Sequence, residues 1–166
     1  MPDDFDTQPT GMRSVVVRPA RPNDLDSLLV LLREFADAPA PGRTAAEPAE
    51  GALAREILVS VLEQPGRTLL VGEIGGEIVG TADLLIVPNL MRRGAPWAIL
   101  ENVVVTSRLR RQGIGRALLE EAIRQAREAG SYKLQLLSNK HRTDAHAFYE
   151  SVGFAATAEG FRLYFE

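Results

Sequence analysis

"VVVTSRLRRQGIGRALLEEA", residues 103–122, contains the features that decide the fold of this chain. The β-branched run at its start predicts a strand, and the residues from 113 onward predict a helix. Four arginines and two closely spaced glycines lie at the junction. A helix N-terminus has unpaired backbone amides and a partial positive charge, so a loop entering it can bind an anion, usually a phosphate.

The residue types at this junction favour such an anion site. Gly113 and Gly115 lack the Cβ atoms that would hold a phosphate away from the amides, and arginines add charge-assisted hydrogen bonds. The stretch is not a Walker A loop, which ends in Gly-Lys-Ser/Thr, nor a dinucleotide fingerprint, which needs a small residue where Leu118 stands. The alternative is an ordinary strand-to-helix turn with solvated arginines.

Length and composition limit the classes of protein. The 166 residues suit one domain, and a net charge of −3 gives no general attraction to nucleic acid or to an acidic membrane. The absence of cysteine excludes disulfides, thiolate catalysis and cysteine-ligated zinc. No apolar run is long enough to span a membrane, and the acidic N-terminus lacks the apolar core of a signal peptide. We expect a disordered tail over 1–12, a single domain over 13–166 and a cytoplasmic location.

The order of elements predicts an α/β (α+β) fold. Strands are expected at 13–20, twice within 67–87 around a Gly75-Gly76 hairpin, at 98–106, at 132–138, and once or twice in the tail after 154. Helices are expected after an Asn23 cap, between loop 36–50 and Pro65, at 113–129 and at 142–153. The unit 98–138 predicts a parallel strand pair. The expected architecture is a mixed central sheet of six to seven strands flanked by about four helices.

Two motifs carry a resemblance to a known family. The stretch 101–122 resembles the acetyl-CoA signature of the GNAT acetyltransferase superfamily, Arg/Gln-x-x-Gly-x-Gly/Ala, matched here by residues 110–115. The stretch "AHAFYESVGF" (145–154) resembles the second common stretch of that superfamily, which ends in aromatic-Tyr-x-x-x-Gly-Phe. The resemblance implies the GNAT fold with a splayed parallel strand pair. It also implies an acetyl-CoA-dependent N-acetyltransferase that transfers the acetyl group directly to an amine of a small molecule or protein, without a metal.

The resemblance also implies which residues bind acetyl-CoA. The valine run would pair with pantetheine through backbone groups left free by the splay, and the turn amides would hold the pyrophosphate. Asn139 would contact pantetheine from the end of the next strand, with Ser138 as a weaker candidate. The full set is Val103, Val104, Val105, Arg110, Arg111, Gln112, Gly113, Ile114, Gly115, Arg116 and Asn139. The family often has an asparagine seven residues before the tyrosine, where this chain has Arg142.

Tyr149 and Glu101 are the candidate catalytic residues. By the resemblance, Tyr149 would act as a general acid that protonates the departing CoA thiolate, although it could instead be a core aromatic. An amine acceptor is mostly protonated at neutral pH and needs a base. Glu101 is the candidate, because strand alternation puts it on the face of Val103 and Val105. It could instead be a hydrogen-bonded strand-end residue, and Asp83 is the reserve.

Other interpretations remain open at this stage. His141 and His146 are five residues apart, which does not put them on one helical face, so solvated or capping roles fit better than a metal site. A CoA-binding sensor or regulatory module with little turnover is the alternative function. The expected partner is an amine acceptor, and neither nucleic acid nor a membrane is expected. Similar proteins often dimerise through a sheet edge, which leaves a homodimer open.

Overall fold

The computed structural model describes residues 14–35 and 47–165 of the chain, so the predicted tail 1–12 and most of the loop 36–50 lie outside it. Five strands occur in the described residues: β1 (Val16–Pro19), β2 (Arg67–Ile74), β3 (Glu77–Val87), β4 (Trp97–Val105) and β5 (Leu134–Gln135). The helices are α1 (Leu25–Phe35), α2 (Gly51–Glu63), α3 (Ile114–Glu128) and α4 (Thr143–Ser151). Short 3₁₀ turns span Pro22–Asp24, Arg92–Gly94 and Ser107–Leu109.

The strands form one mixed sheet in the order β1-β2-β3-β4-β5. Neighbours from β1 to β4 are antiparallel, and β4 and β5 form the predicted parallel pair. The hairpin between β2 and β3 turns at Gly75 and Gly76, whose φ angles of 61° and 84° are readily adopted by glycine. The mixed α/β class, the hairpin and the parallel pair are therefore confirmed.

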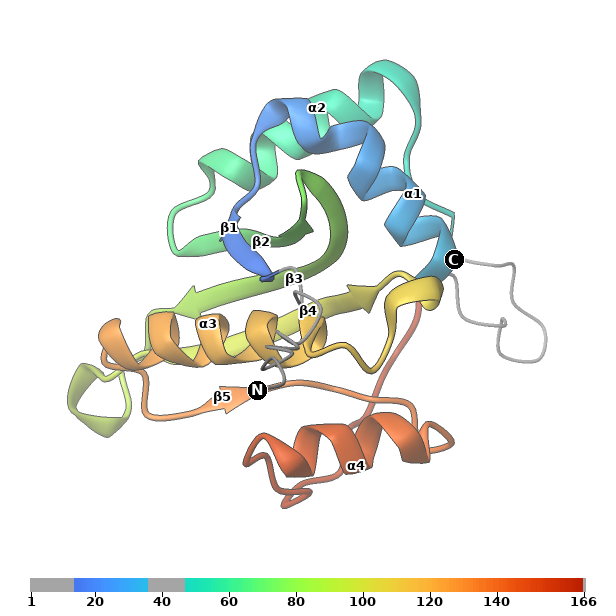
Figure 1. Cartoon of the computed structure of the whole chain (residues 1–166). Coiled ribbons are helices and arrows are strands. Elements are labelled where there is room, and N and C mark those ends of the chain that lie inside the picture. Colours follow the sequence, from blue (N-terminus) through green and yellow to red (C-terminus); the bar gives the residue numbers. More distant parts are fainter. Residues whose placement is uncertain (1–13, 36–46, 166) are drawn as a thin grey trace, which may run out of the picture.

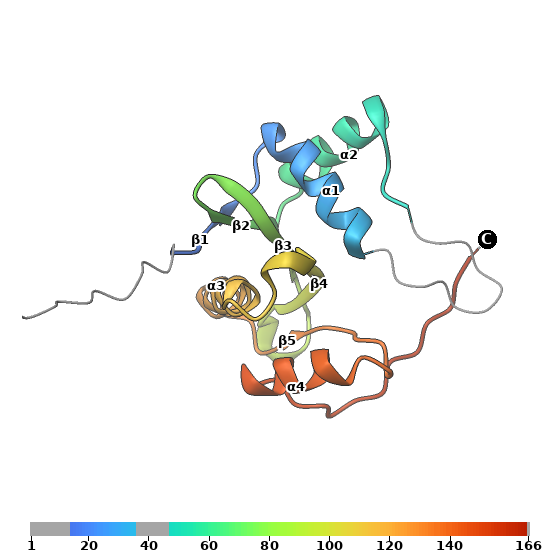
Figure 2. The same cartoon turned by 45° about the vertical axis from the view of Figure 1, so that its right-hand side comes forward.

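Helices cover both faces of the sheet (Figures 1 and 2). Helices α1 and α2 lie on one face, and α3 lies on the other with α4 beside β5. The predicted apolar stripe of α3 is buried against the strands. Its members are Ile114, Leu118, Ala122 and Ala126. Leu25 and Leu28 of α1 pack with Leu58 of α2 in a second apolar cluster. The site described below lies where α3, α4 and the diverging strands meet.

The sheet has fewer strands than the six to seven expected. Strand β5 covers only Leu134–Gln135 of the predicted 132–138, and no strand forms in the tail between 155 and 165. Phe161 and Phe165 of the tail are 89% and 87% exposed, so their alternation with polar residues does not mark a buried face. A period-2 pattern predicts which side chains share a face, but the strand also needs a hydrogen-bonding partner.

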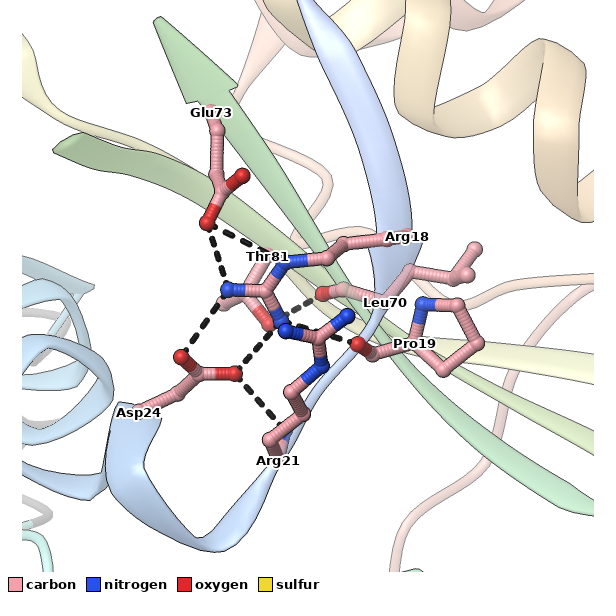
Figure 3. Close-up of polar contacts among 7 residues, drawn as sticks. All are labelled: Arg18, Pro19, Arg21, Asp24, Leu70, Glu73 and Thr81. Atoms are coloured by element: carbon pink, nitrogen blue, oxygen red, sulfur yellow. Dashed lines mark hydrogen bonds and ion pairs between the residues drawn. The ribbon is translucent and has the colours of Figure 1, made fainter. Parts of the chain in front are cut away.

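A charged cluster fastens the start of α1 to the sheet (Figure 3). Arg18 of β1 donates from Nη1 and Nη2 to the two carboxylate oxygens of Asp24, at 2.7 and 3.0 Å, and from Nε to Glu73 of β2 at 3.1 Å. Asp24 also accepts the backbone amide of Arg21 at 2.7 Å. The predicted cap at Asn23 is wrong, because Asn23 lies inside the 3₁₀ turn that Asp24 closes.

This cluster makes the stability of the fold sensitive to acid. Hydrogen bonds from Arg18 hold the pKa of Asp24 below its ordinary value, against an opposing effect of burial. A carboxyl group whose pKa is lower in the folded state contributes stability above its unfolded pKa, and this contribution disappears as the pH falls through the folded pKa. Asp24 should therefore stabilise the fold at neutral pH.

Asp24→Asn should lower the free energy of unfolding by about 1 to 3 kcal/mol at neutral pH, because hydrogen bonds to a charged group are lost. It should also flatten the loss of stability as the pH falls below the ordinary aspartate pKa of about 4. Denaturant unfolding at a series of pH values measures both effects. Asp26→Asn, on the exposed side of α1, is the control. An Asp24→Asn variant with the parent's pH dependence would contradict this role.

Candidate functional site

Strand β4 is irregular where the valine run begins. Glu101 pairs with Asp83 and Val104 pairs with Thr81, so three residue steps on β4 match two on β3. This is a β-bulge, and Asn102 within it has a φ of 50°, in the left-handed region that asparagine tolerates better than most residues. The bulge interrupts the alternation of side chains along the strand.

The bulge changes the face on which Glu101 lies. Because Asp83 and Thr81 are two residues apart on β3, their partners Glu101 and Val104 share a face. Val103 and Val105 instead pack against the apolar cluster beneath α3. The prediction that Glu101 shares the face of Val103 and Val105 is therefore wrong, since simple alternation does not include the inserted residue.

A cavity opens where the parallel strands separate. Strand β5 pairs with β4 only at Ala98–Leu134 and Ile99–Gln135, which confirms the splayed pair. Beyond these positions a cavity of about 190 Å³ lies between residues 100–103 and 136–139. Arg142, Tyr149 and Arg162 complete its wall. Its volume is below the usual range for a pocket that encloses a whole ligand.

The start of α3 has the backbone geometry expected for an anion site. Gly113 is the residue before the helix and has a φ of 83°. The first backbone hydrogen bond into α3 is donated by Ala117 to the Gly113 carbonyl at 2.9 Å, and no side chain caps the helix. Within the described residues, the amides of 114–116 therefore have no acceptor. They remain available to an anion.

The arginines beside this turn fall into two groups. Arg108 forms an ion pair with Glu77, and Arg116 donates from Nη2 to Ser151 Oγ at 3.1 Å. The side chains of Arg110 and Arg111 are exposed, and the structure gives them no hydrogen bond or ion pair within its described part. Arg110 and Arg111 are therefore the two arginines of the predicted set best placed to bind an external anion.

Glu34 of α1 fixes the turn that leads into this loop, and sequence reasoning missed it. Its carboxylate accepts the backbone amide of Ser107 at 2.8 Å and the hydroxyl of Thr106 at 2.9 Å. The hydrogen bond from the Ser107 amide is the main reason that the pKa of Glu34 lies below its ordinary value. The two segments are more than 70 residues apart in the chain, so no local pattern could have indicated the contact.

Gly115 also packs closely against α4. A Cβ atom at this position would lie 3.2 Å from Cζ of Phe148 on α4 and 3.6 Å from Cγ2 of Val105. The first distance is tighter than most carbon contacts, so a side chain here would require the Phe148 ring to shift by a few tenths of an ångström. The predicted role of Gly115 in phosphate approach stays a prediction, and its close contact with α4 is a second reason for glycine.

The two candidate catalytic residues line the same cavity. Burial raises the pKa of the Tyr149 hydroxyl, with Arg142 lowering it and the charge of Glu101 raising it. Burial also raises the pKa of Glu101, with Arg162 lowering it and Asp83 raising it. Glu101 is exposed to solvent at the edge of the cavity, and solvent screening limits this rise in its pKa. The structure thus brings the two candidate residues to one cavity.

Asp83 is bound elsewhere. It is 2% exposed and forms an ion pair with Arg67, whose Nε donates to Oδ1 at 2.9 Å. Both carboxylate oxygens of Asp83 are bonded to Arg67, and Asp83 is not among the residues that line the cavity. The geometry therefore favours Glu101, which has no hydrogen bond in the described structure, over the reserve candidate.

The segment after β5 contributes polar groups to the cavity. Asn139 lines it and uses its side-chain oxygen to accept the His141 amide at 3.1 Å. The ring of His146 contacts the Asn139 carbonyl at 3.0 Å, in agreement with a capping role. Ser138 Oγ also lies in this wall and is buried without a hydrogen-bond partner in the described residues. An unpaired buried hydroxyl indicates a position where a ligand can bind.

Family and structural comparisons agree with this geometry. Residues 29–154 match the model of the acetyltransferase (GNAT) family. The chain is 32% identical over 159 residues to a glucosamine 6-phosphate N-acetyltransferase from Trypanosoma brucei brucei, covering 93% of this chain and 98% of that protein.

Two solved structures share the fold over nearly their whole length. A putative acetyltransferase from Agrobacterium tumefaciens has a TM-score of 0.80 and 38% identity, with 90% of this chain and 99% of that chain covered. A protein from Bacillus halodurans described as a transcriptional regulator has a TM-score of 0.78 and 32% identity, with 92% and 100% covered.

The chain belongs to the GNAT family of acetyltransferases. It is an N-acetyltransferase of the kind that uses acetyl-CoA as acetyl donor, as the sequence resemblance predicts. In residues 14–35 and 47–165, no group of three or more acidic or histidine side chains could hold a metal ion. None of the helices in these segments is both long and apolar enough to cross a membrane.

Gly115→Ala should destabilise the fold by roughly 1 to 3 kcal/mol, because the added methyl group overpacks against Phe148. Removing the obstruction tests the cause: in a Phe148→Leu background, the same substitution should have a smaller effect. Thermal unfolding of the four proteins in this cycle measures the coupling. Equal effects of Gly115→Ala in both backgrounds would exclude the contact as the reason for glycine.

Proposed function

We propose that the protein transfers the acetyl group of acetyl-CoA directly to an amine within the cavity between β4 and β5. The observation that carries this proposal is that Glu101 and Tyr149 line one cavity, at the point where the parallel strands separate. The whole reaction then takes place in one complex of enzyme, acetyl-CoA and amine, and needs no covalent intermediate with the protein.

The binding set for acetyl-CoA divides between the loop and the strands. The amides at the start of α3, together with Arg110, Arg111, Gln112 and Arg116, would hold the pyrophosphate. Gly113 and Gly115 have no side chains, so the pyrophosphate can closely approach the backbone of these two residues and of Ile114. Backbone groups of residues 103–105 would pair with the pantetheine arm, since β5 leaves their edge free. Asn139 and the unpaired Ser138 hydroxyl lie opposite that edge and would bind the same arm.

The chemistry follows from the two titratable groups. Glu101, directly or through a water molecule, takes a proton from the ammonium form of the acceptor. The amine nitrogen then attacks the thioester carbonyl carbon, and the carbon–sulfur bond breaks as the amide forms. Tyr149 donates its proton to the departing thiolate and takes up, directly or through water, the second proton that the nitrogen loses, while the proton on Glu101 passes to solvent. A raised pKa makes Glu101 a stronger base. Burial raises the pKa of Tyr149, so its hydroxyl is protonated at neutral pH and can donate.

The acceptor is an amine of a small molecule or protein. The similar protein from Trypanosoma brucei brucei is named for glucosamine 6-phosphate, which makes amino sugar phosphates the first acceptors to test. We further propose that residues 13–166 act as a single catalytic domain and that it works in the cytoplasm.

A CoA-binding regulatory module is the second candidate function. The similar protein from Bacillus halodurans is described as a transcriptional regulator, which favours this alternative. The presence of both Glu101 and Tyr149 in the cavity favours turnover. The two functions differ in whether free thiol is released when acetyl-CoA and an amine are both present.

Calorimetry should detect coenzyme A binding, and Gly113→Ala should weaken it by about tenfold or more through strain at the loop and an intruding methyl group. Gly51→Ala is a matched control, because Gly51 also has a positive φ and open space around it, away from the loop. A panel of amines with acetyl-CoA should release free thiol. Binding without thiol release across the panel would instead support the regulatory module, and no binding would reject both.

Glu101→Gln and Tyr149→Phe should each lower kcat by roughly a hundredfold or more, as expected for lost proton transfer. In the parent enzyme kcat/KM should rise as the pH increases through the raised pKa of Glu101, and Glu101→Gln should remove this limb. Tyr132→Phe, an exposed tyrosine outside the cavity, is the control. If Tyr149→Phe kept full kcat, Tyr149 would be only a packing residue, because the ring is retained.

A further inference from the structure

The wall of the cavity contains more positively charged than negatively charged side chains. Among the lining residues Glu101 is the one carboxylate, whereas Arg142 and Arg162 supply two guanidinium groups. Neither arginine would be needed if the cavity only accepted a proton from an ammonium ion and bound an uncharged thioester. Their presence calls for a physical reason.

The tail places Arg162 at the cavity. The segment after α4 passes close over the segment after β5, where a Cβ atom on Gly160 would lie 2.8 Å from Cδ2 of Leu137. Two residues later, Arg162 lines the cavity together with Glu101. The charge of Arg162 lowers the pKa of Glu101, so the two groups are electrostatically close.

Arg142 reaches the cavity from the other side. It precedes α4, where its backbone amide donates to the Asn139 carbonyl at 3.0 Å, and its side chain is half-buried. Its charge lowers the pKa of Tyr149, which places its guanidinium near the hydroxyl. Arg162 therefore lies toward the proton acceptor and Arg142 toward the proton donor.

Neither guanidinium has a partner within the described residues. The structure gives the side chains of Arg142 and Arg162 no hydrogen bond and no ion pair. By contrast, two other half-buried arginines of the fold are paired: Arg18 with Asp24 and Glu73, and Arg67 with Asp83. A guanidinium has several donors in a planar fork that matches a carboxylate or a phosphate.

We propose that the acceptor is an amine that also carries an anionic group, a phosphate or a carboxylate, and that Arg162 binds this group with Arg142 as a second cation. This inference rests on the proposed function and names its substrate class. The amine would face Glu101 while its anionic group faces Arg162, so one molecule would satisfy both charges. Arg162 is then a residue that determines specificity, and Glu101 remains the base.

Matched acceptors test this proposal. Glucosamine 6-phosphate and glucosamine differ in a phosphate, and alanine and alaninamide differ in a carboxylate charge. The parent enzyme should show kcat/KM about tenfold or more higher for the anionic member of at least one pair, the size expected for a charge-assisted hydrogen bond. The pair that shows the difference identifies the anionic group.

The variants assign the effect to Arg162. Arg162→Gln should raise KM for the anionic acceptor about tenfold or more and leave KM for acetyl-CoA and for the neutral acceptor unchanged. Arg162→Lys should recover part of the loss, because it keeps the charge without the fork. Arg55→Gln, an exposed arginine on α2 away from the cavity, should have no effect.

Three results would overturn the proposal: equal kcat/KM within both pairs, equal losses for charged and neutral acceptors in Arg162→Gln, or a higher KM for acetyl-CoA alone. Calorimetry with glucosamine 6-phosphate and alanine, on protein saturated with coenzyme A, separates this inference from the proposed function. Binding that Arg162→Gln abolishes, without thiol release from any acceptor, would support the anion site and reject catalysis. Absence of both binding and turnover would reject the two together.

Discussion

The separation of β4 from β5 is the constraint on which the rest of the site depends. A parallel pair that stops after two positions leaves backbone donors and acceptors of both strands without partners in the sheet. The bulge at Asn102 bends β4 at the same level and turns Glu101 to the face opposite Val103. The bulged part of β4, the segment after β5 and residues of α4 and the turn before it thus line one opening.

The distribution of charge explains why the chemistry is assigned to Glu101. Elsewhere the fold neutralises its buried acids with arginine, as Arg67 does for Asp83 and Arg18 does for Asp24. Glu101 receives no such hydrogen bond, although Asp83 lies directly across the ladder from it. A carboxylate left unpaired beside another acid keeps a higher affinity for a proton. The same fold therefore contains carboxylates fixed in ion pairs and, at the cavity, a carboxylate without such a partner.

The sequence predicts local elements well and their departures from regularity poorly. The Gly75-Gly76 turn and the apolar stripe of α3 are local signals, and both are confirmed. The bulge is missed because nothing in a run of strand-forming residues indicates an extra residue, apart from Asn102 itself. The splayed strand pair is predicted from the family resemblance, because sequence periodicity contains no information on where the hydrogen bonding between two strands ends. The one or two strands expected in the tail do not form between 155 and 165, and no local pattern indicates that the tail brings Arg162 to the cavity.

The short ladder between β4 and β5 also divides the molecule into parts of unequal stability. Strands β1 to β4 are joined along most of their length, whereas the chain from β5 onward is held by two ladder positions and the packing of α4. Local opening requires less free energy where fewer contacts are broken, so amide hydrogen exchange should be faster in this C-terminal segment. A molecule bound between β4 and β5 would contact both parts of the structure. Its binding should slow amide hydrogen exchange well beyond the residues it touches.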